Sequence, residues 1–382
     1  MLAVWLPFVM ANITVVARAD TAIDAFYRAD FLYNHSGGIE TGSTYLDDAV
    51  LTFETDLEDR FGMAGATSFV SLLWNNNNTF SDQYVGDLQV ISNIDAEKAL
   101  RIYELWYEQP VADSVTLRFG LYDLNSEFDA IDTSGLFINS SHGIGADYGQ
   151  SGQNGPSIFP VTSLTARFDW QISGASNLRY AILDGVPGDP DDPSKTTIDL
   201  GDGDGVLHAL EFNQVLASGT RVGVGTWLYS ANFDRIDGNG QDGGNAGFYG
   251  FVDMPLKSVV DDGFGLAGFL RYGTANDEIN VLGRYFGGGV VATGLIRSRP
   301  DDQIGFAIAS ARVGDPFQRA ADLEGAPADS HETNIELTYS THLNDWLRIQ
   351  PNIQYVINPG ADKALGNAFV FGIRFEVSAS SR

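Results

Sequence analysis

Apolar and polar residues alternate along much of the chain, with a period of two residues rather than 3.6. Segments 115–121 (VTLRFGL), 164–170 (LTARFDW) and 347–355 (LRIQPNIQY) each place mainly apolar residues on one face and polar or charged residues on the other. Successive side chains of a β-strand point to opposite faces of the sheet. The alternation therefore predicts an all-β fold, with clusters of Gly, Asn and Asp as the turns between strands.

Segment 101–108 (RIYELWYE) has the same period and an unusual content of aromatic residues and carboxylates. The period assigns its side chains to two faces: Tyr103, Leu105 and Tyr107 on one, and Ile102, Glu104, Trp106 and Glu108 on the other. We expect the first face to be apolar and the second to be rich in carboxylates.

No stretch of 18 or more uncharged apolar residues occurs, so the sequence predicts no transmembrane helix. The sequence remains compatible with a membrane β-barrel, because the strands of such a barrel need about 9–11 residues and are apolar only at every second position. A soluble β-sandwich also alternates. Aromatic residues near strand ends, charges near mid-strand and alternation from about residue 49 to the end favour a closed transmembrane antiparallel β-barrel.

Composition excludes several classes of protein. The formal net charge of -28 argues against binding to nucleic acid, which requires clustered Lys and Arg. Cysteine is absent, and the five histidines form no metal-binding motif, so we expect neither disulfides nor a metal site nor a cofactor.

The sequence carries no signature of catalysis. Glu104 and Glu108 would lie about 13 Å apart along one strand face, too far for a pair of glycosidase carboxylates on that strand. Nucleophile-elbow, phosphate-loop and zinc signatures are also missing. We expect no enzymatic activity.

The N-terminus contains an apolar stretch followed by Ala17-Arg18-Ala19, which resembles a cleavage site, although no basic residue precedes the apolar part. We interpret residues 1–19 as a signal peptide and residues 20–382 as a single barrel domain. The alternative is that residues 13–34 belong to the first strand.

Residues 120–160 (GLYDLNSEFDAIDTSGLFINSSHGIGADYGQSGQNGPSIFP) closely resemble the signature of the OprB-type carbohydrate-selective porins. Five further blocks are similar to that family in the same order: SGG at 36–38 with DLE at 56–58, and the segments 85–109, 184–190, 298–309 and 336–360. The resemblance implies a 16-stranded barrel in the bacterial outer membrane, usually a homotrimer, through which glucose and other small sugars diffuse. The chain departs from many outer-membrane barrels by ending in SASSR instead of Phe, so we expect Phe375 to serve as the assembly signal.

The polar faces supply candidate channel-lining residues. They are Glu104, Trp106, Glu108, Arg118, Arg167, Arg179, Glu336, Arg348 and Arg374. A sugar needs paired donors and acceptors for its hydroxyls and a flat apolar surface for its ring. Solvation of the lumen and bracing by ion pairs are the alternative roles for each charge, and anchoring at the membrane interface is the alternative for Trp106.

The signature stretch is too long for a tight turn, so we expect a loop that folds into the barrel and narrows it; an ordinary extracellular loop is the alternative. Two other functions stay open at this point: a general diffusion porin without sugar preference, and a soluble β-sheet protein that binds sugars.

Residues 200–211 (LGDGDGVLHALE) nearly match a calcium-binding loop, but Leu200 occupies the first ligand position, and we favour an acidic turn. Outer-membrane lipid and lipopolysaccharide are further expected partners. Divalent cations on the Asp-rich segments 189–192 and 234–242 are one way of bridging to lipopolysaccharide.

Overall fold

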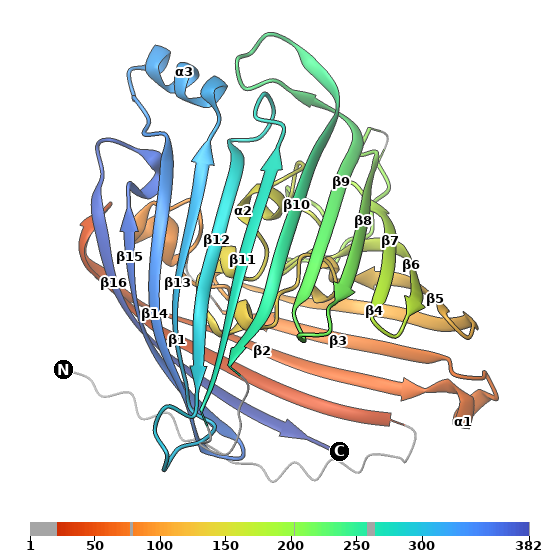
Figure 1. The fold of residues 1–382 in the computed structure, drawn as a ribbon. Helices are drawn as coiled ribbons and strands as arrows, with labels where there is room; N and C mark the ends of the chain where they lie inside the picture. The colour runs from red at the N-terminus through yellow and green to blue at the C-terminus, as the bar shows by residue number, and fades with distance from the viewer. Residues whose placement is uncertain (1–20, 77–78, 202, 258–263, 382) are drawn as a thin grey trace.

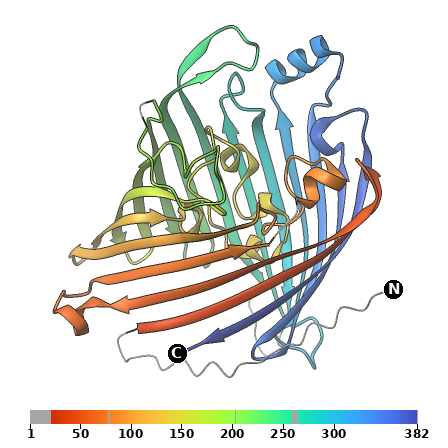
Figure 2. The same cartoon turned by 180° about the vertical axis from the view of Figure 1, so that it is seen from behind.

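The computed structural model describes residues 21–76, 79–201, 203–257 and 264–381, and within them sixteen antiparallel strands form a closed barrel (Figures 1 and 2). Each strand pairs with its neighbours in the sequence, and β1 closes the barrel against β16, with the register running from Asp24 opposite Ser380 to Gly38 opposite Gly366. Closure leaves no unpaired sheet edge, as a membrane requires of a β-structure. The predicted fold is confirmed, whereas the predicted signal peptide lies outside the described residues.

The strands are β1 (Thr21–Gly38), β2 (Gly42–Asp56), β3 (Thr67–Asn75), β4 (Ala99–Ala112), β5 (Val115–Tyr122), β6 (Ser163–Ser173), β7 (Ser176–Asp184), β8 (Val206–Val215), β9 (Arg221–Asp234), β10 (Gln241–Lys257), β11 (Gly265–Ala275), β12 (Leu282–Thr293), β13 (Gln303–Val313), β14 (His331–Asn344), β15 (Leu347–Ile357) and β16 (Gly366–Ser380). The helical elements are α1 (Leu57–Phe61), α2 (Ala146–Gly149), α3 (Asp315–Glu324), η1 (Ser81–Val85), η2 (Leu124–Ser126), η3 (Thr133–Leu136), η4 (Ser140–His142) and η5 (Pro359–Ala361). No helix of the described residues is long and apolar enough to cross a membrane.

The period-two pattern fixes which side chains point into the barrel. In β14, Glu332, Asn334 and Glu336 are fully buried inside, whereas Leu337 is 45% exposed on the outside. Strand β11 repeats this arrangement, with Arg271 buried inside and Tyr272 exposed outside. The outer face is thus apolar and aromatic, as a lipid-facing surface should be.

Two predicted face assignments in segment 101–108, those of Ile102 and Tyr103, are wrong. The pairing between β3 and β4 has a bulge, because Ser71 lies opposite Glu104 while Leu72 lies opposite Ile102. One extra residue reverses the direction of the side chains beyond it. Ile102 is therefore 40% exposed on the outside, and Tyr103, expected outside, lines an internal cavity.

The connections differ at the two ends of the barrel. At one end, turns such as those between Ala112 and Val115 or Asn344 and Leu347 are short. At the other end, long connections follow β3, β5, β7 and β13. Two of these fold into the barrel, at residues 79–98 and 123–162 (Figures 1 and 2). The predicted inward loop is present, and residues 79–98 form a second inserted segment that the sequence pattern did not reveal.

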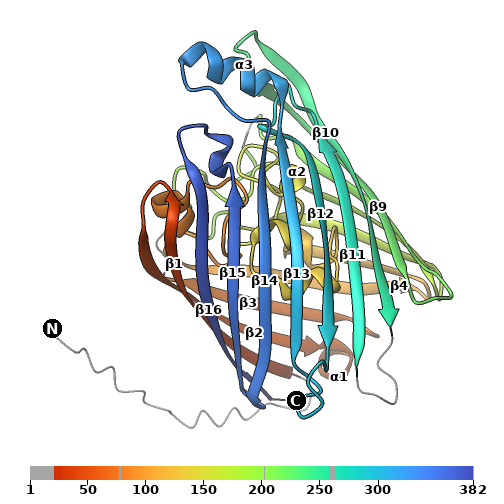
Figure 3. The ribbon, with the colours of Figure 1, turned by 60° about the vertical axis from the view of Figure 1, so that its left-hand side comes forward.

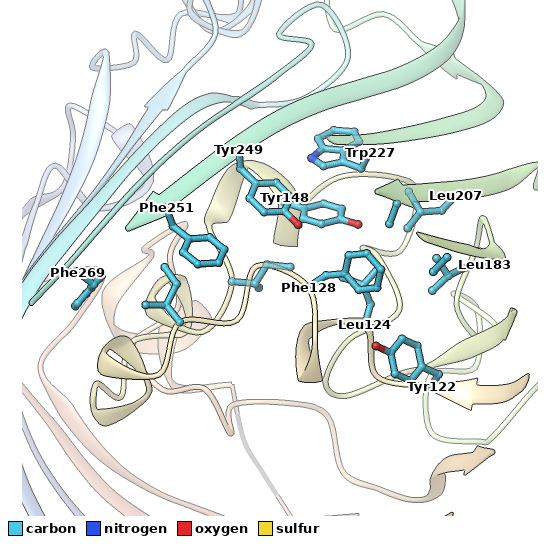
Figure 4. Close-up of a cluster of buried hydrophobic side chains, with 14 of the residues drawn as sticks. Tyr122, Leu124, Phe128, Tyr148, Leu183, Leu207, Trp227, Tyr249, Phe251 and Phe269 are labelled. Atoms are coloured by element: carbon cyan, nitrogen blue, oxygen red, sulfur yellow. The ribbon is translucent and has the colours of Figure 1, made fainter. Parts of the chain in front are cut away.

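Packing of residues 123–162 against the barrel interior creates the largest apolar cluster. Tyr148 of α2 stacks on Trp227 of β9 at a centroid distance of 5.2 Å and lies 5.8 Å from Tyr249 of β10 (Figure 4). Tyr148, Trp227 and Tyr249 are at most 1% exposed. Buried aromatic side chains contribute large apolar areas and favourable ring contacts, so this cluster holds the loop on one side of the lumen.

Candidate functional site

A buried ion triad attaches the inserted loop to the barrel. Arg271 of β11 donates to Asp129 Oδ2 at 2.8 Å and also pairs with Asp147. Glu211 of β8 accepts a hydrogen bond from the backbone N–H of Asp129 at 2.7 Å. Removing one partner from a buried ion pair is strongly destabilising, so Arg271 is a principal anchor of the loop.

Inward polar residues of β14 and β15 bind the backbone of both inserted segments. The Glu336 carboxylate accepts from the N–H groups of Ile138 and Asn139 at 2.9 and 3.0 Å. Gln350 donates to the carbonyl of Leu136 at 2.6 Å, and Gln354 donates to that of Ile91 at 2.8 Å. We call strands β8–β15 the anchoring wall. Their side chains replace the hydrogen bonds to water that the backbone groups of the inserted segments lose when they are buried.

The second inserted segment is held in the same manner. Glu332 accepts from the N–H groups of Leu88 and Gln89 at 2.8 and 3.0 Å. Arg374 of β16 forms a bidentate pair with Asp30 at 2.7 and 2.8 Å and donates to Asn93 at 2.8 Å.

The two inserted segments also bond to each other. The N–H of Asn93 donates to the carbonyl of Ile138 at 2.9 Å, and the N–H of Ser140 donates to that of Val90 at 3.1 Å. The two segments therefore act as one insert.

Five of the predicted lining residues come together around the start of the inserted loop. The carboxylate of Glu127 receives Arg167 at 2.8 Å, Arg118 at 3.6 Å and Arg179 at 3.7 Å. Glu108 also pairs with Arg118 and Arg167, at 2.9 and 2.7 Å. Burial alone would raise the pKa of Glu127, but the guanidinium groups of Arg179, Arg118 and Arg167 outweigh it and hold the pKa below its ordinary value.

Trp106, the fifth of these residues, is partly covered by neighbours. Its ring stacks on Phe69 at 5.0 Å and lies 3.9 Å from the guanidinium of Arg118, and its indole N–H donates to Glu104 at 3.2 Å. Cation–π contact and stacking of this kind orient the arginine. They also leave little of the ring for a sugar.

A cavity of about 500 Å³ lies between the insert and strands β1–β4, called here the open wall. Its polar lining comprises Arg28, Thr52, Ser71, Asn93, Tyr103, Glu104, Asp123, Asn125, Ser140 and Glu376, and its apolar lining includes Phe26, Phe69, Ile144, Ile158 and Phe159. Glu104 is the one predicted site residue among them. The cavity thus combines acceptors, amides, hydroxyls and aromatic rings on facing sides.

Charge in this cavity is set by burial. The backbone N–H of Asp123 donates to Glu104 at 3.2 Å, which brings two acidic residues together. Burial raises the pKa of Asp123 to about 6, against hydrogen bonds from the Tyr103 hydroxyl and from the backbone of Asn125 and Ser126, which lower it. On the facing side Arg28 is paired with Asp48 at 2.5 Å.

Arg348 lies next to a residue of the first cavity but does not line that cavity itself. It lines a second cavity of about 440 Å³ together with Asp132, Thr133 and Gln303, close to the end of the barrel with short turns. Its guanidinium lies 3.8 Å from Glu376. The nine predicted residues therefore lie in four places. Glu104 lines the cavity beside the open wall, five residues form the network around Glu127, Glu336 and Arg374 anchor the insert, and Arg348 lines this second cavity.

Several cavity residues escaped the sequence analysis. Tyr103 was assigned to the wrong face because of the bulge in β4. Arg28 lies in β1, where Phe26, Arg28 and Asp30 alternate with outward residues, so the period-two pattern could have identified it. Asn93 and Asp123 lie in irregular segments, and no local pattern marks their positions.

The near-match to a calcium loop does not form one in the described residues. Glu211, its twelfth residue, is buried in β8 and accepts from Tyr249 at 2.6 Å, while Asp202 lies outside the described residues. Among the residues that the structure describes, no group of three or more His, Asp or Glu side chains is arranged to hold a metal ion.

A closed barrel with an apolar outer face, a polar interior and an inserted constriction defines an outer-membrane channel. Residues 40–378 match the family described as "Carbohydrate-selective porin, OprB family", and the chain belongs to this family. The protein is thus a carbohydrate porin of the bacterial outer membrane, in a family of channels rather than enzymes.

Similar proteins agree with this assignment. Porin B of Pseudomonas aeruginosa is 23% identical over 393 residues, covering 92% of this chain and 86% of the relative. The high-pH structure of Pseudomonas putida OprB superposes with a TM-score of 0.85 at 19% identity, covering 94% of each chain. The outer-membrane channel DcaP of Acinetobacter baumannii shares the fold at a TM-score of 0.58 and 11% identity, covering 95% of this chain and 99% of that one.

Proposed function

We propose that small, glucose-like mono- and oligosaccharides diffuse down their gradient through the cavity between the insert and the open wall. The observation that supports this path is the lining itself. Carboxylates, amides and hydroxyls such as Asp123, Asn93 and Tyr103 face the same space as Phe26 and Phe159. A sugar ring needs acceptors and donors for its hydroxyls and an apolar surface for its face. Permeation of this kind requires neither catalysis nor a cofactor.

We further propose distinct roles for the predicted site residues. Glu104 contacts the sugar directly, and Arg348 meets it near the periplasmic exit. Trp106, Glu108, Arg118, Arg167 and Arg179 act as positioning residues that fix Glu127 and hence the edge of the insert, and Glu336 and Arg374 position the insert from the opposite side. This assignment follows from their partners, which are protein groups in the described residues.

Liposome swelling tests the proposal directly. Proteoliposomes would be compared in isotonic glucose, in a trisaccharide and in an amino acid of similar size. Faster swelling in glucose than in the amino acid is the expected result, and equal rates would instead indicate a general diffusion porin. Absence of swelling with folded protein would contradict a channel through this cavity.

Two variants locate the path. We expect Phe26→Trp to slow glucose entry, because it enlarges a side chain that lines the cavity and is 40% exposed. The matched control is Phe306→Trp, on the outer face of β13 and 45% exposed. Equal effects of the two substitutions would argue against passage beside Phe26.

Assembly and lipid contacts complete the proposal. We propose a homotrimer that uses an outward aromatic surface of β1, β2 and β16, where Phe31 lies 4.8 Å from Tyr45 and 6.0 Å from Phe375. Native mass spectrometry of detergent-extracted protein tests this stoichiometry. Outer-membrane lipid and lipopolysaccharide cover the remaining apolar face.

A further inference from the structure

The arginines on the strands of this acidic chain lie on both faces of the barrel. Several that point into the barrel are paired with carboxylates, as Arg271, Arg167 and Arg374 are. Arg284 of β12 and Arg312 of β13 lie on the outer face instead, opposite each other in the strand register. Their neighbours on the inner face, Tyr285 and Ala311, are buried.

Placing two cations directly opposite each other on one sheet face is unfavourable. Arg312 has one weak partner, Asp315 at 3.5 Å, and both side chains are about half exposed or more, at 49% and 65%. Among the described residues Arg284 has no hydrogen-bond or ion-pair partner. An anion shared between the two guanidinium groups would turn this repulsion into attraction.

The positions of Arg284 and Arg312 along their strands place the pair near one end of the barrel. Arg284 is the third residue of β12 and Arg312 the last but one of β13, both at the end with long connections, which is the extracellular end in this class of barrel (Figure 3). The register continues the polar row with Thr274 on one side and the exposed His331 on the other.

Directly below this row the outer face becomes aromatic and apolar. Tyr272 and Phe286 lie opposite each other and are 49% and 47% exposed. Leu270 follows in β11, 48% exposed. A ligand in this place would therefore meet cations at its head and an apolar surface beneath.

We propose that Arg284 and Arg312 bind a phosphate group of an outer-leaflet glycolipid whose acyl chains lie over Tyr272, Phe286 and Leu270. Guanidinium groups bind phosphate through paired, charge-assisted hydrogen bonds, and the outer leaflet of this membrane consists of phosphorylated lipopolysaccharide. The inference makes the proposed lipid contact specific and is independent of sugar conduction. It assigns the contact to arginines and not to cation-bridged Asp-rich loops.

Native mass spectrometry tests the site by measuring how lipid A binds to the delipidated full-length protein in detergent. The probes are diphosphorylated lipid A, the same lipid without phosphates, and inorganic phosphate. We expect R284Q and R312Q each to weaken binding of diphosphorylated lipid A about tenfold. The double variant should bind it no better than the dephosphorylated lipid.

The control is R60Q/R297Q, which removes two exposed arginines from the opposite end of the barrel. Heat-modified migration on gels checks that every variant is folded, and liposome swelling should be unchanged in R284Q/R312Q. Equal losses in the test and control variants would overturn the site. So would equal affinity for both forms of lipid A, saturation by inorganic phosphate without any contribution from the lipid, or dissociation of an oligomer by R284Q/R312Q.

Discussion

The strands of the open wall and those of the anchoring wall show the same alternation of apolar and polar residues, yet their inward polar groups contact different partners. In the anchoring wall, Glu332, Glu336 and Gln354 are fully buried and bonded to the inserted backbone. In the open wall, Tyr103 and Glu104 border a cavity. A polar residue in the alternating pattern therefore identifies the inner face of the barrel. The path of the insert decides whether that residue binds the insert or contacts a solute.

The largest effect should come from detaching the insert. Arg271→Met leaves Asp129 and Asp147 buried without their cation, at a cost of roughly 3–5 kcal/mol in the free energy of unfolding. We expect the loop to leave the anchoring wall, which raises single-channel conductance and abolishes any preference for glucose. Arg235→Met, in a partly exposed ion cluster of the connections at the end of the barrel, is the control. Unchanged conductance in Arg271→Met would show that the triad does not hold the constriction.

A smaller effect is expected at the start of the loop. Glu127→Gln removes the charge that faces Arg118, Arg167 and Arg179. Each of these three arginines keeps another carboxylate nearby. Because the network is partly exposed, we expect a loss of about 1–3 kcal/mol, measured by thermal loss of the folded form on gels. A loss as large as that of Arg271→Met would contradict the ranking of the two anchors.

The charge of the cavity beside the open wall should depend on pH, because the inserted residue Asp123 lines it. Since the pKa of Asp123 is raised to about 6, the folded protein binds this proton more tightly than the unfolded chain does. This group therefore favours the folded state most at low pH, and its contribution declines as pH rises from about 4 to 6. Cation selectivity of the channel should rise as Asp123 loses its proton, between about pH 5 and pH 7 with a midpoint near pH 6.

Asp123→Asn should remove that midpoint from reversal-potential measurements. Asp315→Asn, at the exposed start of α3, should leave it in place. A midpoint that persists in Asp123→Asn would assign the titration to another group, such as Asp95, whose pKa burial also raises to about 6.

The smallest effect is expected at Trp106. Because its ring is occupied by Phe69 and Arg118, Trp106→Phe should alter glucose flux less than twofold. Phe159→Ala, which removes a ring that lines the cavity, should alter flux more. The reverse order in liposome swelling would restore Trp106 as the sugar platform.

Alternation was enough to predict an all-β fold and to place Arg167, Glu336 and Arg374 on the inner face. The length of the signature stretch indicated the inward loop, and the resemblance added the number of strands. The sequence could not supply their partners, because Arg167 meets Glu127 and Glu336 meets Ile138 only through tertiary contacts. A single bulge reversed Tyr103, since period-two reasoning cannot count an inserted residue. Residues 79–98 lack any regular period, so their entry into the barrel left no local pattern.

Besides the Arg271 triad, many of the barrel's contacts with the insert reach its main chain: Glu336 binds the N–H groups of Ile138 and Asn139, and Gln350 and Gln354 bind carbonyl groups. Main-chain groups are the same whatever residue carries them. Mutations can therefore change many of the insert's solute-facing side chains while its attachment persists. The constriction can diverge toward new solutes during evolution on an unchanged barrel, so relatives with the same fold can differ in what they admit.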